Sequence, residues 1–115
     1  MPHIIIEYSQ DNVSESEINA MISKVFDVVK STMLFDEENI KVRSHPVQHY
    51  KLGLTDSGFI HIQCRIHAGK TTLQKQRLTQ SIVDGLKDLF SQSVVITAEV
   101  ADMDKTTYAK AVLTL

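Results

Sequence analysis

The chain has 115 residues, a length that suits one domain over residues 1–115 and allows about two-thirds of the unfolded surface to be buried. Its 12 lysines and arginines nearly balance 14 aspartates and glutamates, so the charge does not favour nucleic acid as a partner. No apolar run approaches the ~20 residues that cross a bilayer, and the run Ile4–Ile6 is too short for a signal peptide. The single cysteine, Cys64, excludes an internal disulfide. We therefore expect a cytoplasmic protein that has no membrane partner.

The first nine residues predict a strand that begins at once. Three isoleucines followed by Glu7 and Tyr8 are typical of a buried strand, and Pro2 stands before them. Removal of Met1, which is usual before a small second residue, would leave Pro2 with a free secondary amine that could act as a proton-transfer base. While Met1 remains, the same nitrogen is an amide and has no basic lone pair. Proline is also tolerated at the first position of any strand, so a purely structural role for Pro2 stays open.

Two helices are predicted from their start signals and from the spacing of apolar residues. Ser14 and Glu17 have the spacing of a capping box, and the helix after them should extend to about residues 34–35. Thr71 and Gln74 repeat that spacing before a second helix, which should extend to about residue 90. The predicted apolar faces consist of Ile18, Met21, Ile22, Val25, Phe26, Val29 and Met33 in the first helix and Leu73, Leu78, Ile82, Leu86, Leu89 and Phe90 in the second.

Three further strands are predicted from alternation between apolar and polar residues. Pro46 should either stop the second strand or place it at an edge of the sheet. Cys64 falls in the apolar row of the third strand, and we expect it to be a small core residue. These strands are residues 40–45, 59–68 and 94–100, and residues 102–115 form a tail of uncertain form.

The order of these elements is a duplicated β-α-β unit. Because such crossovers are right-handed, both helices should cover the same face of one four-stranded sheet, which makes an α+β fold. The other face would carry His61, Gln63 and Arg65 and would have no covering layer. Neighbouring copies could supply that layer, so we expect an oligomer.

Other chemistries have weaker support. The turn Gly69-Lys70-Thr71 resembles the end of a phosphate-binding loop, but Cys64 stands where that motif needs a glycine, so no nucleotide site is expected. A cation at a helix N-terminus still suits a carboxylate or a single phosphate. No metal site is expected, because Pro46 separates His45 from His49 and no second cysteine is present. No serine or cysteine has the surroundings of a nucleophile.

Lys41 and Arg43 lie on one face of a strand that should run beside the first strand. The simplest interpretation of this pair is a solvated polar face. Together with Pro2 and Lys70, however, the pair would provide one base and three cations. Such a set could bind a small substrate that has carboxylates at its ends.

These residues resemble a known family. Proline directly after Met1, the isoleucine-rich strand 3–9, the block 40–45 and the block 59–71 are together similar to the tautomerase superfamily, and within it to the 5-carboxymethyl-2-hydroxymuconate isomerases. The likeness covers nearly the whole chain in length and order. It implies a homotrimer whose sheets pack around an axis.

The resemblance also implies an activity. Members carry out a proton shift on 2-hydroxy-dienoate or enol carboxylic acids in the catabolism of aromatic compounds, without a cofactor, and their amino-terminal proline is the base. Members often have arginine where Lys41 and Lys70 stand here, while Arg43 matches an arginine of the isomerases. The implied substrate-binding residues are therefore Lys41, Arg43 and Lys70, with Tyr108 as an aromatic wall. The competing hypothesis is a non-catalytic oligomer that has kept the fold.

Overall fold

The structure is a computed structural model that describes all residues, 1–115. Two short 3-10 helices, η1 and η2, precede β2 and follow β4. The elements in chain order are β1 (His3–Ser9), α1 (Glu15–Ser31), η1 (Glu37–Asn39), β2 (Lys41–Val47), β3 (Gly58–His67), α2 (Thr72–Leu86), β4 (Val94–Met103) and η2 (Lys105–Thr107).

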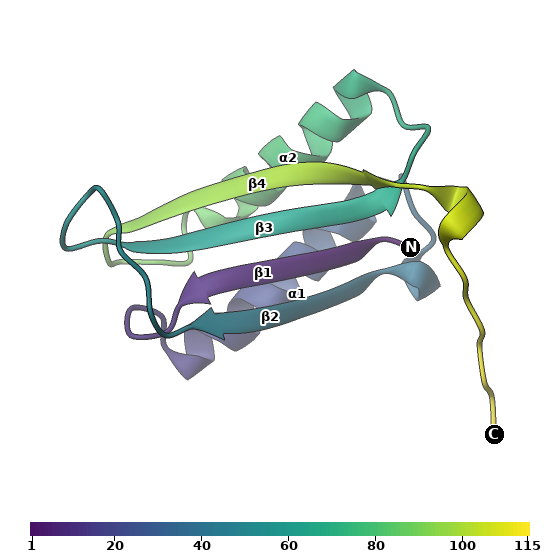
Figure 1. The fold of residues 1–115 in the computed structure, drawn as a ribbon. Helices are drawn as coiled ribbons and strands as arrows, with labels where there is room; N and C mark the ends of the chain where they lie inside the picture. The colour runs from purple at the N-terminus through teal and green to yellow at the C-terminus, as the bar shows by residue number, and fades with distance from the viewer.

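One four-stranded sheet, in the order β2-β1-β3-β4, forms the body of the molecule. β1 is parallel to β2, β3 is parallel to β4, and the central pair β1 and β3 is antiparallel. Both helices lie behind the same face of this sheet (Figure 1). The predicted α+β fold with a duplicated β-α-β unit is therefore confirmed. Neither helix is long and apolar enough to cross a membrane.

Both predicted capping boxes are present. Ser14 Oγ accepts a hydrogen bond from the backbone N–H of Glu17, whose carboxylate accepts one from the N–H of Ser14 at 2.9 Å. Thr71 and Gln74 make the same pair of bonds at the start of α2. Each bond satisfies a backbone donor that the first turn of a helix leaves free, so these residues fix where the helices begin.

The predicted helix ends were too late. α1 ends at Ser31 because Met33 takes a left-handed backbone conformation, with φ 59°, that turns the chain away. Met33 is 85% exposed, so its predicted place on the apolar face was wrong. α2 ends at Leu86, and Leu73 in its first turn is 54% exposed and is also not a core residue.

The core fills the space between the sheet and the two helices. The apolar row predicted for β3 is confirmed for Ile60, Ile62, Cys64 and Ile66, which have no more than 1% of their surface exposed. Ala68, predicted as the last member of the row, lies beyond the strand and is exposed. Burial raises the pKa of the Cys64 thiol to about 12, so the thiol stays neutral. The 15 core residues are Ile4, Ile6, Tyr8, Val13, Met21, Val25, Val29, Ile40, Ile60, Ile62, Cys64, Ile66, Leu78, Ile82 and Leu86.

Two strands extend further than predicted. β2 continues through Pro46 to Val47, which is possible because β2 is an edge strand and the proline lacks only an N–H. β4 continues to Met103, where it still pairs with His67 at the end of β3. The extra length of β4 brings the start of the tail to the end of the sheet at which β1 begins.

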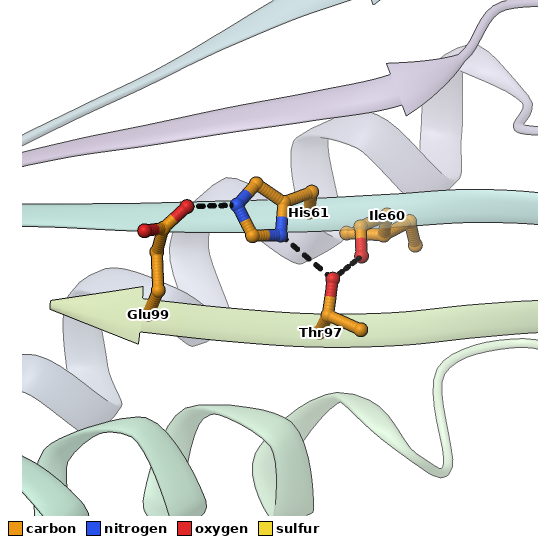
Figure 2. Close-up of polar contacts among 4 residues, drawn as sticks. All are labelled: Ile60, His61, Thr97 and Glu99. Carbon is orange, nitrogen blue, oxygen red and sulfur yellow. Dashed lines mark hydrogen bonds and ion pairs between the residues drawn. The ribbon is translucent and has the colours of Figure 1, made fainter. Parts of the chain in front are cut away.

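The face of the sheet opposite the helices carries a polar cluster on β3 and β4 (Figure 2). His61 Nε2 lies 2.5 Å from Glu99 Oε2, and His61 Nδ1 lies 2.7 Å from the hydroxyl of Thr97. Apolar side chains share this face, including Val95, which is exposed. No segment of this chain covers the cluster, as the sequence pattern predicted.

Candidate active site

The predicted site residues meet at one end of the sheet's strands. β1 and β2 begin there and β3 and β4 end there, because the two parallel pairs are joined antiparallel (Figure 1). Pro2 is fully buried, and its carbonyl accepts a hydrogen bond from the backbone N–H of Lys41 at 3.1 Å. The proline is thus fixed between the first strand and its parallel neighbour. Its nitrogen is acylated by Met1 in this structure.

The amino terminus lies among positive charges. Burial lowers the pKa of the Met1 amine, and the ammonium groups of Lys41 and Lys110 lower it further. Lys41 Nζ donates to the backbone carbonyl of Asn39 at 3.0 Å, and Lys110 Nζ donates to the Asn39 side chain at 2.9 Å. An amine held at this place is therefore biased toward its neutral, basic form.

Two cavities lie near the amino terminus: Met1 lines one of them, and Lys41 and Lys110, whose charges act on the Met1 amine, line the other. The first, of about 210 Å³, is lined by Met1, Lys70, His67 and Phe35 among others, and Lys70 Nζ lies 5.7 Å from the centre of the Phe35 ring. The second, of about 550 Å³, lies between η1 and the tail and is lined by Lys41, Tyr108 and Lys110 among others. Each cavity therefore presents at least one cation to a bound molecule.

Arg43 is linked to these cavities through a residue that the sequence analysis did not select. Its guanidinium lies 3.1 Å from Nδ1 of His3, and Nε2 of His3 lies 3.0 Å from the hydroxyl of Tyr108. Burial first, and then the positive charge of Arg43, lower the pKa of His3, which favours the neutral form of this imidazole. A further cavity, of about 500 Å³ between α1 and β2, is lined by both Lys41 and Arg43.

Comparison with known proteins identifies the family. The sequence model described as 5-carboxymethyl-2-hydroxymuconate isomerase matches residues 2–112. The chain belongs to this family. It is also 26% identical, over 93 residues, to the 5-carboxymethyl-2-hydroxymuconate Delta-isomerase of Escherichia coli, a match that covers 79% of this chain and 74% of that protein.

Solved structures of similar proteins agree with this fold. A 5-carboxymethyl-2-hydroxymuconate isomerase from Deinococcus radiodurans R1 superimposes with a TM-score of 0.82 over 96% of this chain and 88% of its own, at 23% identity. A fused 4-OT described as a symmetric trimer superimposes with a TM-score of 0.76 over 95% and 93%, at 13% identity. These structures show a shared fold, while the family match and the Escherichia coli relative show that the chain is an isomerase.

In this member of the 5-carboxymethyl-2-hydroxymuconate isomerase family, three polar residues lie near the amino terminus that the sequence pattern did not predict as site residues. His3 shares its sheet face with Arg43, which strand alternation could have shown once the register was known. His67 lines the cavity at Met1, and its Nδ1 is buried without a hydrogen-bond partner. Lys110 lies in the tail, where no periodic pattern exists, so its place beside the amine had no sequence signal.

Proposed function

We propose that Met1 is removed and that the amine of Pro2 is the base in a proton shift on a small 2-hydroxy-dienoate or enol carboxylic acid. The observation that carries this proposal is the position of Pro2, which is fully buried at the start of β1 next to the Met1 amine, whose pKa is lowered by partial burial and by the charges of Lys41 and Lys110. The proline nitrogen would take the proton of the 2-hydroxyl group and return it to a carbon of the dienol. The O–H bond breaks, a carbonyl forms, and a new C–H bond forms. One base serves both steps, and this chemistry requires no cofactor.

The base must be neutral at working pH. A free α-amine has a pKa near ~8, and a prolyl amine is more basic, so the site must lower the pKa. Each unit of lowering corresponds to about 1.4 kcal/mol. Burial of Pro2 and the nearby charges of Lys41 and Lys110 act in this direction.

Cations on both sides of the amino terminus support a dicarboxylate substrate. Lys70 lines the cavity at Met1 and Lys41 lines the cavity beside the tail, while Arg43 contacts His3. These groups would bind the carboxylates and stabilise negative charge that develops on the dienolate. A lysine offers a point charge instead of the planar two-pronged contact of an arginine, so substrate preference would differ from members with arginine at Lys41 and Lys70.

The open sheet face supports assembly as a homotrimer. Its mixture of apolar side chains and the His61–Glu99 pair suits an interface between subunits, and the fused 4-OT with the same fold is described as a symmetric trimer. The proposed setting is cytoplasmic catabolism of aromatic compounds. A non-catalytic oligomer is the alternative, and the state of Pro2 separates the two.

The test combines mass and turnover. Intact mass of the native protein should show loss of Met1, and the protein should ketonise 2-hydroxymuconate or phenylenolpyruvate. Pro2→Ala should lower kcat by at least ~100-fold, a typical share of a positioned base, with a smaller change in KM. Pro46→Ala is the matched control, because Pro46 lies in edge strand β2 near its far end. Retained Met1, or full activity of Pro2→Ala, would refute the proposal.

A further inference from the structure

A chain of hydrogen bonds joins the sheet to the tail beside the proposed base. It passes from the guanidinium of Arg43 through both ring nitrogens of His3 to the hydroxyl of Tyr108, with heavy-atom distances of 3.1 and 3.0 Å. His3 directly follows Pro2, and Tyr108 lines the cavity that also contains Lys41. These hydrogen bonds therefore connect three residues of the site that lie far apart in the sequence.

The chemistry of Arg43 fixes where the protons lie in this chain. A guanidinium only donates hydrogen bonds, so Nδ1 of His3 must accept and carries no proton. The proton of the neutral ring is then on Nε2, which donates to the oxygen of Tyr108. The hydroxyl hydrogen of Tyr108 makes no hydrogen bond to another residue of the protein. It therefore remains available to a bound molecule.

The ring of Tyr108 is held in place as well as its oxygen. The tyrosine ring packs edge-on against His67 with 5.0 Å between ring centres, and against His3 with 6.1 Å. Two contacts on the ring and one on the oxygen leave the torsion of the O–H bond as the main freedom. Tyr108 thus lines the cavity and also offers it a hydrogen-bond donor at a fixed position.

We propose that Tyr108 donates a hydrogen bond to an anionic oxygen of the substrate, and that His3 is the positioning residue that holds the Tyr108 hydroxyl in the direction of the cavity. The inference rests on the proposed function, because it assigns the group that meets a carboxylate or enolate oxygen in the cavity shared with Lys41. It explains why a tyrosine stands in a wall whose shape a phenylalanine would fill equally well. His3 itself does not touch the substrate.

The first test uses adipate, a saturated six-carbon dicarboxylate that cannot react, with isothermal titration calorimetry on the whole protein. Tyr108→Phe should weaken binding roughly tenfold or more, the usual loss for a hydrogen bond to a charged group. His3→Leu should weaken binding measurably but less, because the Tyr108 hydroxyl keeps its hydrogen and loses only the contact that orients it. The double variant should bind no more weakly than Tyr108→Phe alone, since both changes remove one interaction. Losses that multiply in the double variant would refute the inference.

Two variants serve as controls for His3. His3→Gln keeps one acceptor and one donor on the same side chain, so it should restore most of the affinity that His3→Leu loses. His45→Leu changes a histidine that is exposed farther along β2 and should leave adipate binding unchanged. Failure of His3→Gln to bind better than His3→Leu would contradict the role in proton placement.

A spectroscopic measurement separates this role from simple anchoring of the tail. Adipate is transparent in the near ultraviolet, so binding should produce a tyrosine difference spectrum when Tyr108 donates to a carboxylate. The signal should vanish in Tyr108→Phe and shrink in His3→Leu, which retains the tyrosine. Adipate binding without this signal would overturn the inference. The Pro2→Ala turnover assay reads the base separately, so the proposed function would stand.

Discussion

Gly58, the first residue of β3, is the position where one added carbon should cost the most. A Cβ built on Gly58 would lie 2.1 Å from Oδ1 of Asn12 and 2.5 Å from the hydroxyl of Ser9. Ser9 cannot easily move, because its oxygen accepts the backbone N–H of Phe59 at 3.0 Å. Overpacking of this kind costs about 1–3 kcal/mol, and loss of the Ser9 bond adds about 1 kcal/mol. Gly58→Ala should therefore lower the free energy of unfolding by about 2–4 kcal/mol.

Thermal unfolding measures this effect. With an unfolding entropy of about 2.1 cal/mol/K per residue, each 1 kcal/mol corresponds to roughly 4 °C in a chain of this length, so Tm should fall by roughly 8–16 °C. Gly53→Ala is the control, because no atom lies within 4 Å of its added Cβ. Both variants must be compared with the parent at one protein concentration, since assembly shifts Tm. A Gly58→Ala protein that melts within ~2 °C of the parent would refute the steric argument.

Three further outcomes are expected. Lys110→Met removes a charge that lowers the pKa of the amino terminus, so the acidic limb of kcat/KM against pH should move to higher pH. In the folded protein the pKa of His3 is lowered from 6.5. As pH drops below about 6.5, the imidazole of His3 therefore binds a proton in the unfolded chain before it does so in the folded protein, and the free energy of unfolding should fall. Urea unfolding at several pH values should show this fall, and His3→Gln should reduce it. The Cys64 thiol, buried with a pKa of about 12, should react with a disulfide reagent only after urea unfolds the protein.

The fold was predictable because its signals are local. Alternation in β3 and the capping boxes at Ser14 and Thr71 each depend on a few neighbouring residues, and each is present in the structure. The end of α1 was not predictable from spacing, because Met33 continues the apolar period while its backbone has left the helix. Periodicity records which residues would share a face if a helix continued, and it carries no information about where the helix stops.

The site was predictable only in part, for a different reason. Lys41 was found because it alternates with Arg43 on one face of a predicted strand, and Lys70 because it stands in the turn before the second predicted helix. His3 and Lys110 were not, since their roles depend on pairs separated by 40 and 71 residues, Arg43 with His3 and Asn39 with Lys110. Such contacts follow from strand register and from the path of the tail, and neither has a local signal.

The duplication itself explains why only one end of the sheet suits a site. The two β-α-β halves run in opposite directions, so β1 and β3, which are adjacent, begin at opposite ends of the sheet. At the β3 edge, Asn12 and Ser9 pack against Gly58 with no room for another carbon. At the end of the sheet where β1 begins, two cavities lie near the amino terminus and cations line both. One end of the scaffold is thus closely packed and the other is open and positively charged, and the proposed function needs the open end, where a carboxylate would lie beside a neutral amine.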